Sequence, residues 1–203
     1  MLEKLLDYAK DNDSIRVVIL NGSRVNEKVT PDAYQDIDII YGVTDFDERI
    51  KDDQWLDYFG KQMMMQKPDQ LDVRTKKLEK IKDRYAYLIL FETGIRVDLS
   101  VVKMSCIESF YTSDSLAKIL LDKDYVLTPK PINDHHYRVR PFSKDEVYAH
   151  YNNIMWCSQN VLKGILREEW PYALSMVYKI MMDNVDELVK AYIASNHDDV
   201  NVG

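Results

Sequence analysis

The fold is decided near the amino terminus by Ile15-Arg16-Val17-Val18-Ile19-Leu20-Asn21-Gly22-Ser23-Arg24, a β-branched apolar run that ends abruptly in a turn. The apolar residues predict a buried strand. A glycine at the end of such a strand lets the backbone approach a ligand closely. We therefore expect free N–H groups at the turn, the Ser23 hydroxyl and the Arg24 guanidinium to face a polyphosphate.

A second strand is predicted from Asp36-Ile37-Asp38-Ile39 to Val43, beyond the intervening residues 24–35. The two-residue period of a strand puts Asp36 and Asp38 on one face, roughly 7 Å apart. Two like charges so placed favour a cation, and Mg²⁺ is held by one or two carboxylates together with substrate phosphates. The alternative is a solvated strand edge, where Asp-x-Asp is common.

A third acid lies in a predicted hairpin, whose strands at 85–91 and 95–102 are joined through Glu92-Thr93-Gly94. Asp98 stands between apolar neighbours in its second strand. A buried carboxylate is costly unless it is paired with a cation or a proton. Mg²⁺ beside Asp36 and Asp38 is the partner that we expect for Asp98.

The composition limits the classes of ligand and of location that fit this chain. The 203 residues carry a formal net charge of −7, which argues against a nucleic-acid-binding surface and suits a cationic small substrate. The alternative is that the acidity only keeps the protein soluble. Two cysteines without Cys-x-x-Cys spacing indicate neither a disulfide framework nor a zinc site. We find no pattern of a signal peptide or of a membrane span, so a cytoplasmic location is expected.

A linker is predicted at Thr128-Pro129-Lys130-Pro131-Ile132-Asn133-Asp134, because its two prolines continue neither a helix nor a strand. It divides an α/β domain at 1–130 from a helical domain at 131–203. We expect further helices at 2–10, near 46–59, at 113–121 and from Ser143 to about 166, and strands at 62–66 and 125–127. Capping boxes are predicted at Ser105 and Ser143, and Met63-Met64-Met65 is expected in the core.

The predicted helix after Ser143 places Trp156, Asn160, Lys163 and Arg167 on one stripe. If that stripe faces a cleft, it holds ATP. The alternative is a solvent-facing basic stripe, with Trp156 half-buried at the seam between the two domains. Glu168 and Glu169 end the helix where its dipole disfavours negative charge. A cationic ligand explains them, and the alternative is that they are ordinary surface acids.

Several stretches together resemble one family. The first domain contributes Val18-Ile19-Leu20-Asn21-Gly22-Ser23-Arg24, Gln35-Asp36-Ile37-Asp38-Ile39-Ile40, Val43-Thr44-Asp45, Met64-Met65-Gln66-Lys67-Pro68 and Arg96-Val97-Asp98-Leu99, and the second contributes Lys163-Gly164, Arg167-Glu168-Glu169 and Pro171-Tyr172-Ala173. In this order they resemble the aminoglycoside 6-adenylyltransferases, the streptomycin-modifying enzymes of the nucleotidyltransferase superfamily. The resemblance extends to about Met182.

The resemblance implies an α/β nucleotidyltransferase domain with a mixed, polymerase-β-like sheet, followed by a smaller helical domain, with ATP and Mg²⁺ in the cleft between them. Asp36 and Asp38 are then metal ligands, and Asp98 either completes the metal cluster or takes a proton from the attacking hydroxyl. Gly22, Ser23, Arg24, Lys163 and Arg167 bind the nucleotide, whereas Glu168, Glu169 and Trp156 bind the aminoglycoside. The reaction implied is transfer of AMP to the 6-hydroxyl of streptomycin, with release of pyrophosphate.

Family members continue with several more helices, whereas residues 191–203 here form a polar end that matches nothing in the family. We therefore expect an incomplete substrate-side domain. Two other interpretations stay open at this point. The chain is a truncated or inactive nucleotide-binding member, or an antitoxin-like nucleotidyltransferase that acts on a protein partner. The acceptor is also open between streptomycin, another aminoglycoside, a lincosamide and a protein hydroxyl.

Overall fold

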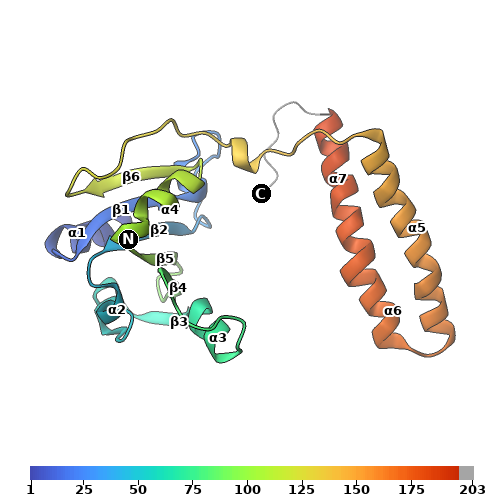
Figure 1. Ribbon diagram of the computed structural model, residues 1–203, viewed down its shortest axis with the longest axis horizontal. Helices are drawn as coiled ribbons and strands as arrows, with labels where there is room; N and C mark the ends of the chain where they lie inside the picture. The colour runs from blue at the N-terminus through green and yellow to red at the C-terminus, as the bar shows by residue number, and fades with distance from the viewer. Residues whose placement is uncertain (197–203) are drawn as a thin grey trace. The chain divides into compact units, whose positions relative to one another are not determined.

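The computed structural model describes residues 1–196 and divides into two compact units, the first at Met1–Asp134 and the second beginning at His135 (Figure 1). The boundary expected from sequence lies four residues earlier, after Lys130. Residues 197–203, which include most of the polar end, lie outside the described part of the chain. None of the helices described is long and apolar enough to cross a membrane.

The first unit is built on one six-stranded mixed sheet with the strand order β3-β4-β5-β2-β1-β6. Its strands are β1 (Ile15–Asn21), β2 (Ile37–Val43), β3 (Gln62–Gln66), β4 (Arg84–Phe91), β5 (Arg96–Lys103) and β6 (Ala117–Asp122). Its helices are α1 (Leu2–Asp11), α2 (Phe46–Arg49), α3 (Pro68–Arg74) and α4 (Ile107–Ser113), with 3₁₀ helices η1 (Gly22–Val25), η2 (Gln54–Phe59) and η3 (Met104–Cys106). Only β2 and β5 pair in parallel, so the mixed α/β sheet expected from sequence is confirmed.

The two faces of the sheet are covered by different elements because neighbouring residues of a strand point to opposite sides. On one face, Ile39 and Leu99 pack in a large core with Leu5 of α1 and Leu56 of η2. On the other face, Ile40 and Val102 pack with Ile107 and Tyr111 of α4. A side chain at Gly42 would lie 3.0 Å from Ile107, so α4 lies directly on β2.

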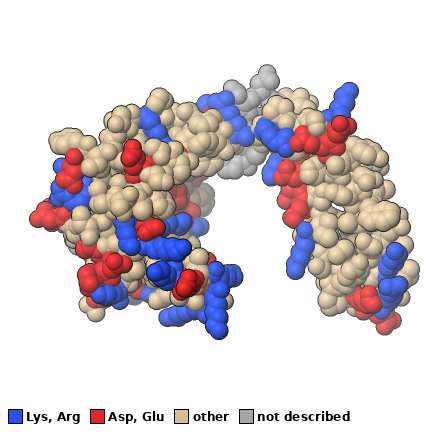
Figure 2. Space-filling model, viewed as in Figure 1, with Lys and Arg blue, Asp and Glu red and all other residues tan. Residues whose placement is uncertain are grey.

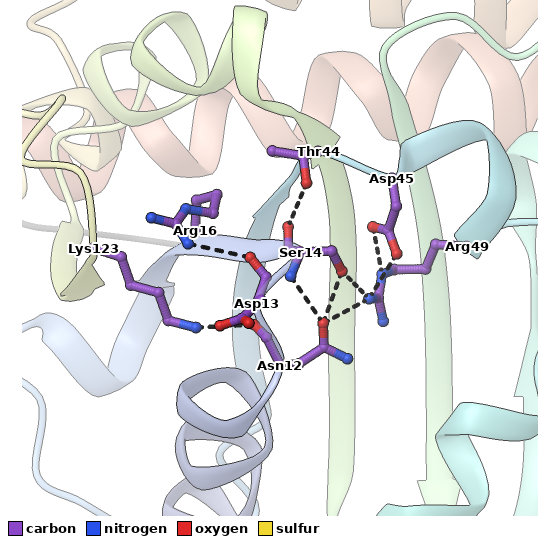
Figure 3. A network of polar contacts seen from close by, with 8 residues as sticks. All are labelled: Asn12, Asp13, Ser14, Arg16, Thr44, Asp45, Arg49 and Lys123. Carbon is purple, nitrogen blue, oxygen red and sulfur yellow. Dashed lines mark hydrogen bonds and ion pairs between the residues drawn. The ribbon is translucent and has the colours of Figure 1, made fainter.

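A polar network fastens the end of the sheet where β1 begins and β2 ends (Figure 3). The buried Arg49 donates to Asp45, Asn12 and Ser14. Lys123 donates to three carbonyl oxygens at the end of α1, those of Ala9, Lys10 and Asn12. Because these contacts satisfy the last carbonyls of α1, they fix that helix to β6.

Three sequence expectations in the first unit are wrong. The helix near 46–59 is two short helices, α2 and η2, because Asp52 accepts from the N–H of Gln54 (3.0 Å) and forms a local turn instead. The helix at 113–121 is strand β6, which pairs with the outer edge of β1. The strand at 125–127 is a turn, in which Asp122 accepts from the N–H of Leu127 (2.8 Å) and Tyr125 has φ = 55°.

Two smaller expectations also need correction. Ser105 does not cap a helix, since α4 begins after Cys106 without a side-chain cap and the Ser105 hydroxyl contacts the Cys106 sulfur (3.7 Å). In strand β3, Met63 and Met64 are exposed rather than part of the core, because β3 is the edge strand of the sheet. Met65 alone of the three packs against the core.

The second unit is a helical pair in which α5 lies against a continuous run of helix. Its elements are the 3₁₀ helix η4 (His135–Tyr137), α5 (Lys144–Leu166), α6 (Trp170–Met176), the π-helical segment η5 (Val177–Met181) and α7 (Met182–Asn196). The capping box at Ser143 is confirmed, with its partner Glu146. A Cβ at Gly164 would lie 2.9 Å from the Cβ of Ala173, so this glycine lets α5 and α6 approach closely.

The helical pair exposes many large apolar side chains. Figure 2 shows a broad uncharged surface along these helices, with charged side chains gathered mainly toward their ends. Trp156 and Tyr192 are each 70% exposed and Leu166 is 74% exposed. Within this unit alone Trp156 is therefore an exposed side chain.

Candidate active site

Asp36, Asp38 and Asp98 gather on the same face of the central sheet. The residues that alternate with them, Ile37, Ile39, Val97 and Leu99, belong to the core on the opposite face. Asp38 and Asp98 lie directly beside each other in the parallel pairing of β2 with β5. Neighbouring strands are about 4.8 Å apart, so residues 60 positions apart in the chain become adjacent carboxylates.

Arg96 joins two of these carboxylates. Its Nε and Nη2 donate to Oδ1 and Oδ2 of Asp98 at 2.9 and 2.7 Å, and its Nη1 lies 3.2 Å from Oδ2 of Asp36. A bidentate arginine–carboxylate pair is the strongest geometry available to these groups. The hydrogen bond to Asp98, followed by the charge of Asp98, raises the pKa of Arg96.

Asp38 is the electrostatically strained member of the cluster. Burial first, and then the charges of Asp98 and Asp36, raise the pKa of the Asp38 carboxyl to about 6, with only partial relief from Arg96. No ion pair to Asp38 is found among the described residues. The site therefore holds more negative charge than its own side chains neutralise, which favours a bound cation.

The donor set suits Mg²⁺, which prefers carboxylate oxygens. Within residues 1–196, however, no three Asp, Glu, His or Cys side chains converge closely enough to hold a metal ion. The expected single shell of Asp36, Asp38 and Asp98 is thus absent from this arrangement. The physical reason lies in Arg96, whose guanidinium occupies the space between the carboxylates of Asp36 and Asp98.

Gly22 lies against the Asp38 carboxylate and has φ = 75°. A Cβ on this residue would be 2.5 Å from Oδ2 of Asp38, which is closer than real atoms approach. Its N–H donates to the carbonyl oxygen of Leu116 (3.1 Å), so the expectation of a free N–H at this residue is wrong. Gly22 instead leaves room for the carboxylate, and the half-buried Ser23 follows it in the first turn of η1.

Arg24 fastens the loop that leads into β2. Its Nε donates to the carbonyl oxygen of Asp36 and its Nη2 to that of Gln35, both at 2.7 Å. The guanidinium therefore already has two acceptors on the protein. These contacts fix the backbone that carries Asp36.

Three further residues belong to this region although no functional role was expected for them from the sequence: Asn21, Arg96 and Asp114. Asn21 pairs with Asp38 in the sheet, and its Nδ2 donates to Oδ2 of Asp114 (2.8 Å). The charge of Asp114 also contributes to the raised pKa of Asp38. Strand alternation from Asp98 places Arg96 on the acidic face and could have identified it, whereas no local signal brings Asp114 to Asn21.

The remaining candidate residues belong to the second unit. Trp156, Lys163 and Arg167 are exposed on α5 or at its end, as are Glu168 and Glu169 just beyond it. Glu168 has φ = 59°, a left-handed conformation that usually favours glycine. Its N–H donates to the carbonyl oxygen of Ile165, and the N–H of Glu169 donates to the carbonyl oxygen of Gly164. These two hydrogen bonds form the Schellman motif that ends a helix.

Comparison with known proteins identifies the family. The family model described as "Streptomycin adenylyltransferase" matches residues 1–203. This chain belongs to the streptomycin adenylyltransferase family. An aminoglycoside 6-adenylyltransferase of Bacillus subtilis (strain 168) is 36% identical over 200 residues, covering 96% of this chain and 68% of the relative. One of Campylobacter jejuni is 34% identical, covering 87% of this chain and 60% of the relative.

A crystal structure of an aminoglycoside 6-adenyltransferase from Bacillus subtilis is 30% identical to this chain, with a TM-score of 0.48. The match covers 97% of this chain and 67% of the chain in that crystal structure. Members of the streptomycin adenylyltransferase family named in these comparisons are nucleotidyltransferase enzymes that transfer AMP to aminoglycosides. The interpretations as an inactive nucleotide-binding protein or an antitoxin-like enzyme are not favoured.

We predict that Asp38→Asn does not destabilise the protein at pH 7. The free energy of unfolding should rise by up to about 1 kcal/mol after allowance for solvent screening. The carboxyl has a pKa of about 6 in the folded chain, against an ordinary value of 3.8. Folding therefore becomes less favourable as the pH rises from about 4 to 6, and the penalty is complete above 6. The gain in the variant should disappear as the pH falls toward 4 in metal-free thermal melts.

Asp98→Asn is the matched control, since it also removes one carboxylate charge but breaks the bidentate pair with Arg96. It should melt at a lower temperature than the wild type. A loss of stability in Asp38→Asn as large as that in Asp98→Asn would contradict our account of the electrostatics.

We predict that Gly22→Ala abolishes AMP transfer while the protein still folds. Its matched control is Gly94→Ala, because Gly94 has φ = 80° but no atom within 4 Å of an added Cβ. Both changes should lower the free energy of unfolding by about 1–2 kcal/mol, because alanine is strained in the left-handed conformation. Only Gly22→Ala also displaces the Asp38 carboxylate. Equal activity in the two variants would show that this contact is dispensable.

Proposed function

We propose that the chain transfers AMP from Mg·ATP to a hydroxyl of streptomycin, with release of pyrophosphate, in the cytoplasm. The observation that carries the proposal is the acidic face on which Asp38 lies beside Asp98 and against Gly22. An under-neutralised carboxylate next to a side-chain-free turn suits a metal-bound polyphosphate.

In this proposal Asp36, Asp38 and Asp98 hold Mg²⁺, which when bound neutralises charge on the triphosphate. Gly22 and Ser23 give the phosphates access to that face. Arg24 acts by holding the Gln35 and Asp36 carbonyls, and so positions the first carboxylate. Asp38 itself is half-buried, so water screens its own charge interactions less than those of an exposed group.

The acceptor hydroxyl attacks the α-phosphorus in line. A bond forms between its oxygen and that phosphorus, and the bond from the α-phosphorus to the oxygen bridging to the β-phosphorus breaks. Pyrophosphate leaves with that bond's electron pair, and a carboxylate accepts the hydroxyl proton. Asp98 is our candidate for this acceptor or for completing the metal site. Both of its oxygens carry hydrogen bonds from Arg96, so either role requires that guanidinium to move.

Streptomycin is the proposed acceptor because its guanidinium groups can pair with carboxylates in bidentate fashion. Glu168 and Glu169 offer two such carboxylates, both exposed at the end of α5. The strained backbone at Glu168 supports a role for this side chain, since a glycine would satisfy the helix end at lower cost. Trp156 is proposed on the same acceptor side.

Pyrophosphate release from Mg·ATP with a panel of aminoglycosides tests the proposal. Streptomycin should support faster release than kanamycin, which carries no guanidinium group. Glu168→Gln should raise KM for streptomycin several-fold, whereas Asp186→Asn, an equivalent change at another exposed acid of the second unit, should not. Faster release with kanamycin would overturn the choice of acceptor, and no release with any acceptor would overturn the function.

Lys163 and Arg167 are proposed as nucleotide-binding cations. Lys163→Ala should raise KM for ATP about tenfold with little change in melting temperature, because the side chain is exposed and its loss removes a charge-assisted contact to phosphate. Lys179→Ala replaces another exposed lysine of the same unit and is the control. An unchanged KM for ATP in Lys163→Ala would remove this residue from the site.

A further inference from the structure

We propose that Arg96 is a removable counter-ion of the active-site carboxylates, which Mg²⁺ displaces when it binds. This inference rests on the proposed function, because it assigns a metal to the acidic face. It adds that a side chain of the protein competes with Mg²⁺ for the same carboxylates. The guanidinium and the metal ion cannot both lie between the carboxylates of Asp36 and Asp98.

The contacts of Arg96 support such an exchange. The hydrogen bonds and ion pairs of its side chain in the described part of the chain go only to Asp98 and Asp36, both of them candidate metal ligands. They use one oxygen of Asp36 and both oxygens of Asp98. While they persist, the carboxylates point toward a guanidinium, and no three-carboxylate metal group forms within residues 1–196.

The exposure of Arg96 shows that it can leave. Its side chain is 47% exposed, against 34% for Asp36 and 22% for Asp98. An ion pair that is open to water is weak, so releasing it costs little free energy. The side chain can then keep its charge in solvent while its backbone stays in β5.

Arg49 provides a contrast within the same unit. Its side chain is only 5% exposed, donates to Asp45, Asn12 and Ser14, and lies over the ring of Trp55. An arginine held in this way is structural, because moving it would break contacts in the segment after α1, at the residue before α2 and in η2 at once. Arg96 has no comparable anchorage among its described contacts.

The exchange also explains why the cluster tolerates three acids. Without a cation, Asp36, Asp38 and Asp98 would repel one another on one sheet face. Arg96 offsets this repulsion in the metal-free chain and leaves Asp38 only partly compensated. The site is therefore kept folded and ready for metal.

The test measures the melting temperature of the full chain without nucleotide, in EDTA and then in a titration with magnesium chloride at constant ionic strength. For Arg96→Gln we expect a lower melting temperature than the wild type in EDTA. The midpoint of its Mg²⁺-dependent rise should fall at about tenfold lower Mg²⁺, because the competing cation is gone. At saturating Mg²⁺ the two proteins should melt at similar temperatures.

Two variants separate displacement from other effects. Arg84→Gln removes the same charge from the neighbouring strand β4, where Arg84 donates to Ser100 (3.2 Å), and should leave the midpoint unchanged. Arg96→Lys keeps the charge without the bidentate fork, so its midpoint should lie between those of the wild type and Arg96→Gln. It also provides the test if Arg96→Gln does not fold.

The outcomes distinguish this inference from the proposed function. If Mg²⁺ raises the melting temperature of the wild type but not of Asp38→Asn, the metal role stands. An unchanged or higher midpoint in Arg96→Gln then overturns the role of Arg96 alone. If Mg²⁺ has no effect on the wild type, or the same effect in Asp38→Asn, both the metal site and the exchange are wrong.

Discussion

The parallel pairing of β2 with β5 is the constraint on which the site depends. It sets Asp38 beside Asp98 and leaves the alternating residues of both strands in the core on the opposite face. A shift of this pairing by one residue would turn one acid into the core and an apolar side chain into the site. The apolar core therefore holds the acids together despite their mutual repulsion.

The groups around the three acids differ in how firmly the protein holds them. The backbone of Gly22 lies against the Asp38 carboxylate, and its N–H donates to the carbonyl oxygen of Leu116, which follows α4. Arg24 fixes the backbone at Asp36, whereas the Arg96 side chain, within the described residues, forms its ion pairs with carboxylates alone. The rigid parts are thus backbone contacts, and the adaptable part is an exposed side chain. Such a division suits the binding and release of a metal-bound nucleotide that we propose for this site.

Errors in the secondary structure expected from sequence have a common cause. Residues 117–122 form a strand because the outer edge of β1 needs a hydrogen-bonding partner, which local periodicity does not reveal. The segment between α4 and this strand then reaches Gly22 and Asn21 through Leu116 and Asp114. The wrongly predicted region is therefore the one that supports the turn at Asn21 and Gly22.

The sequence by itself determined the hairpin with Asp98, the capped helix after Ser143 and the alternation that sets the three acids on strand faces, because strand alternation and helix caps depend on neighbours a few residues apart. The mixed α/β fold followed from the resemblance to a known family. Its motifs also indicated the family. Only the tertiary structure decided that Arg96 neutralises Asp36 and Asp98, that the Gly22 N–H is occupied, and that Asp38 is strained. Local alternation places Arg96 on the same face as Asp98, two residues away, but the contact with Asp36, the bond to Leu116 and the raised pKa of Asp38 arise from strand pairing and from charges distant in the chain.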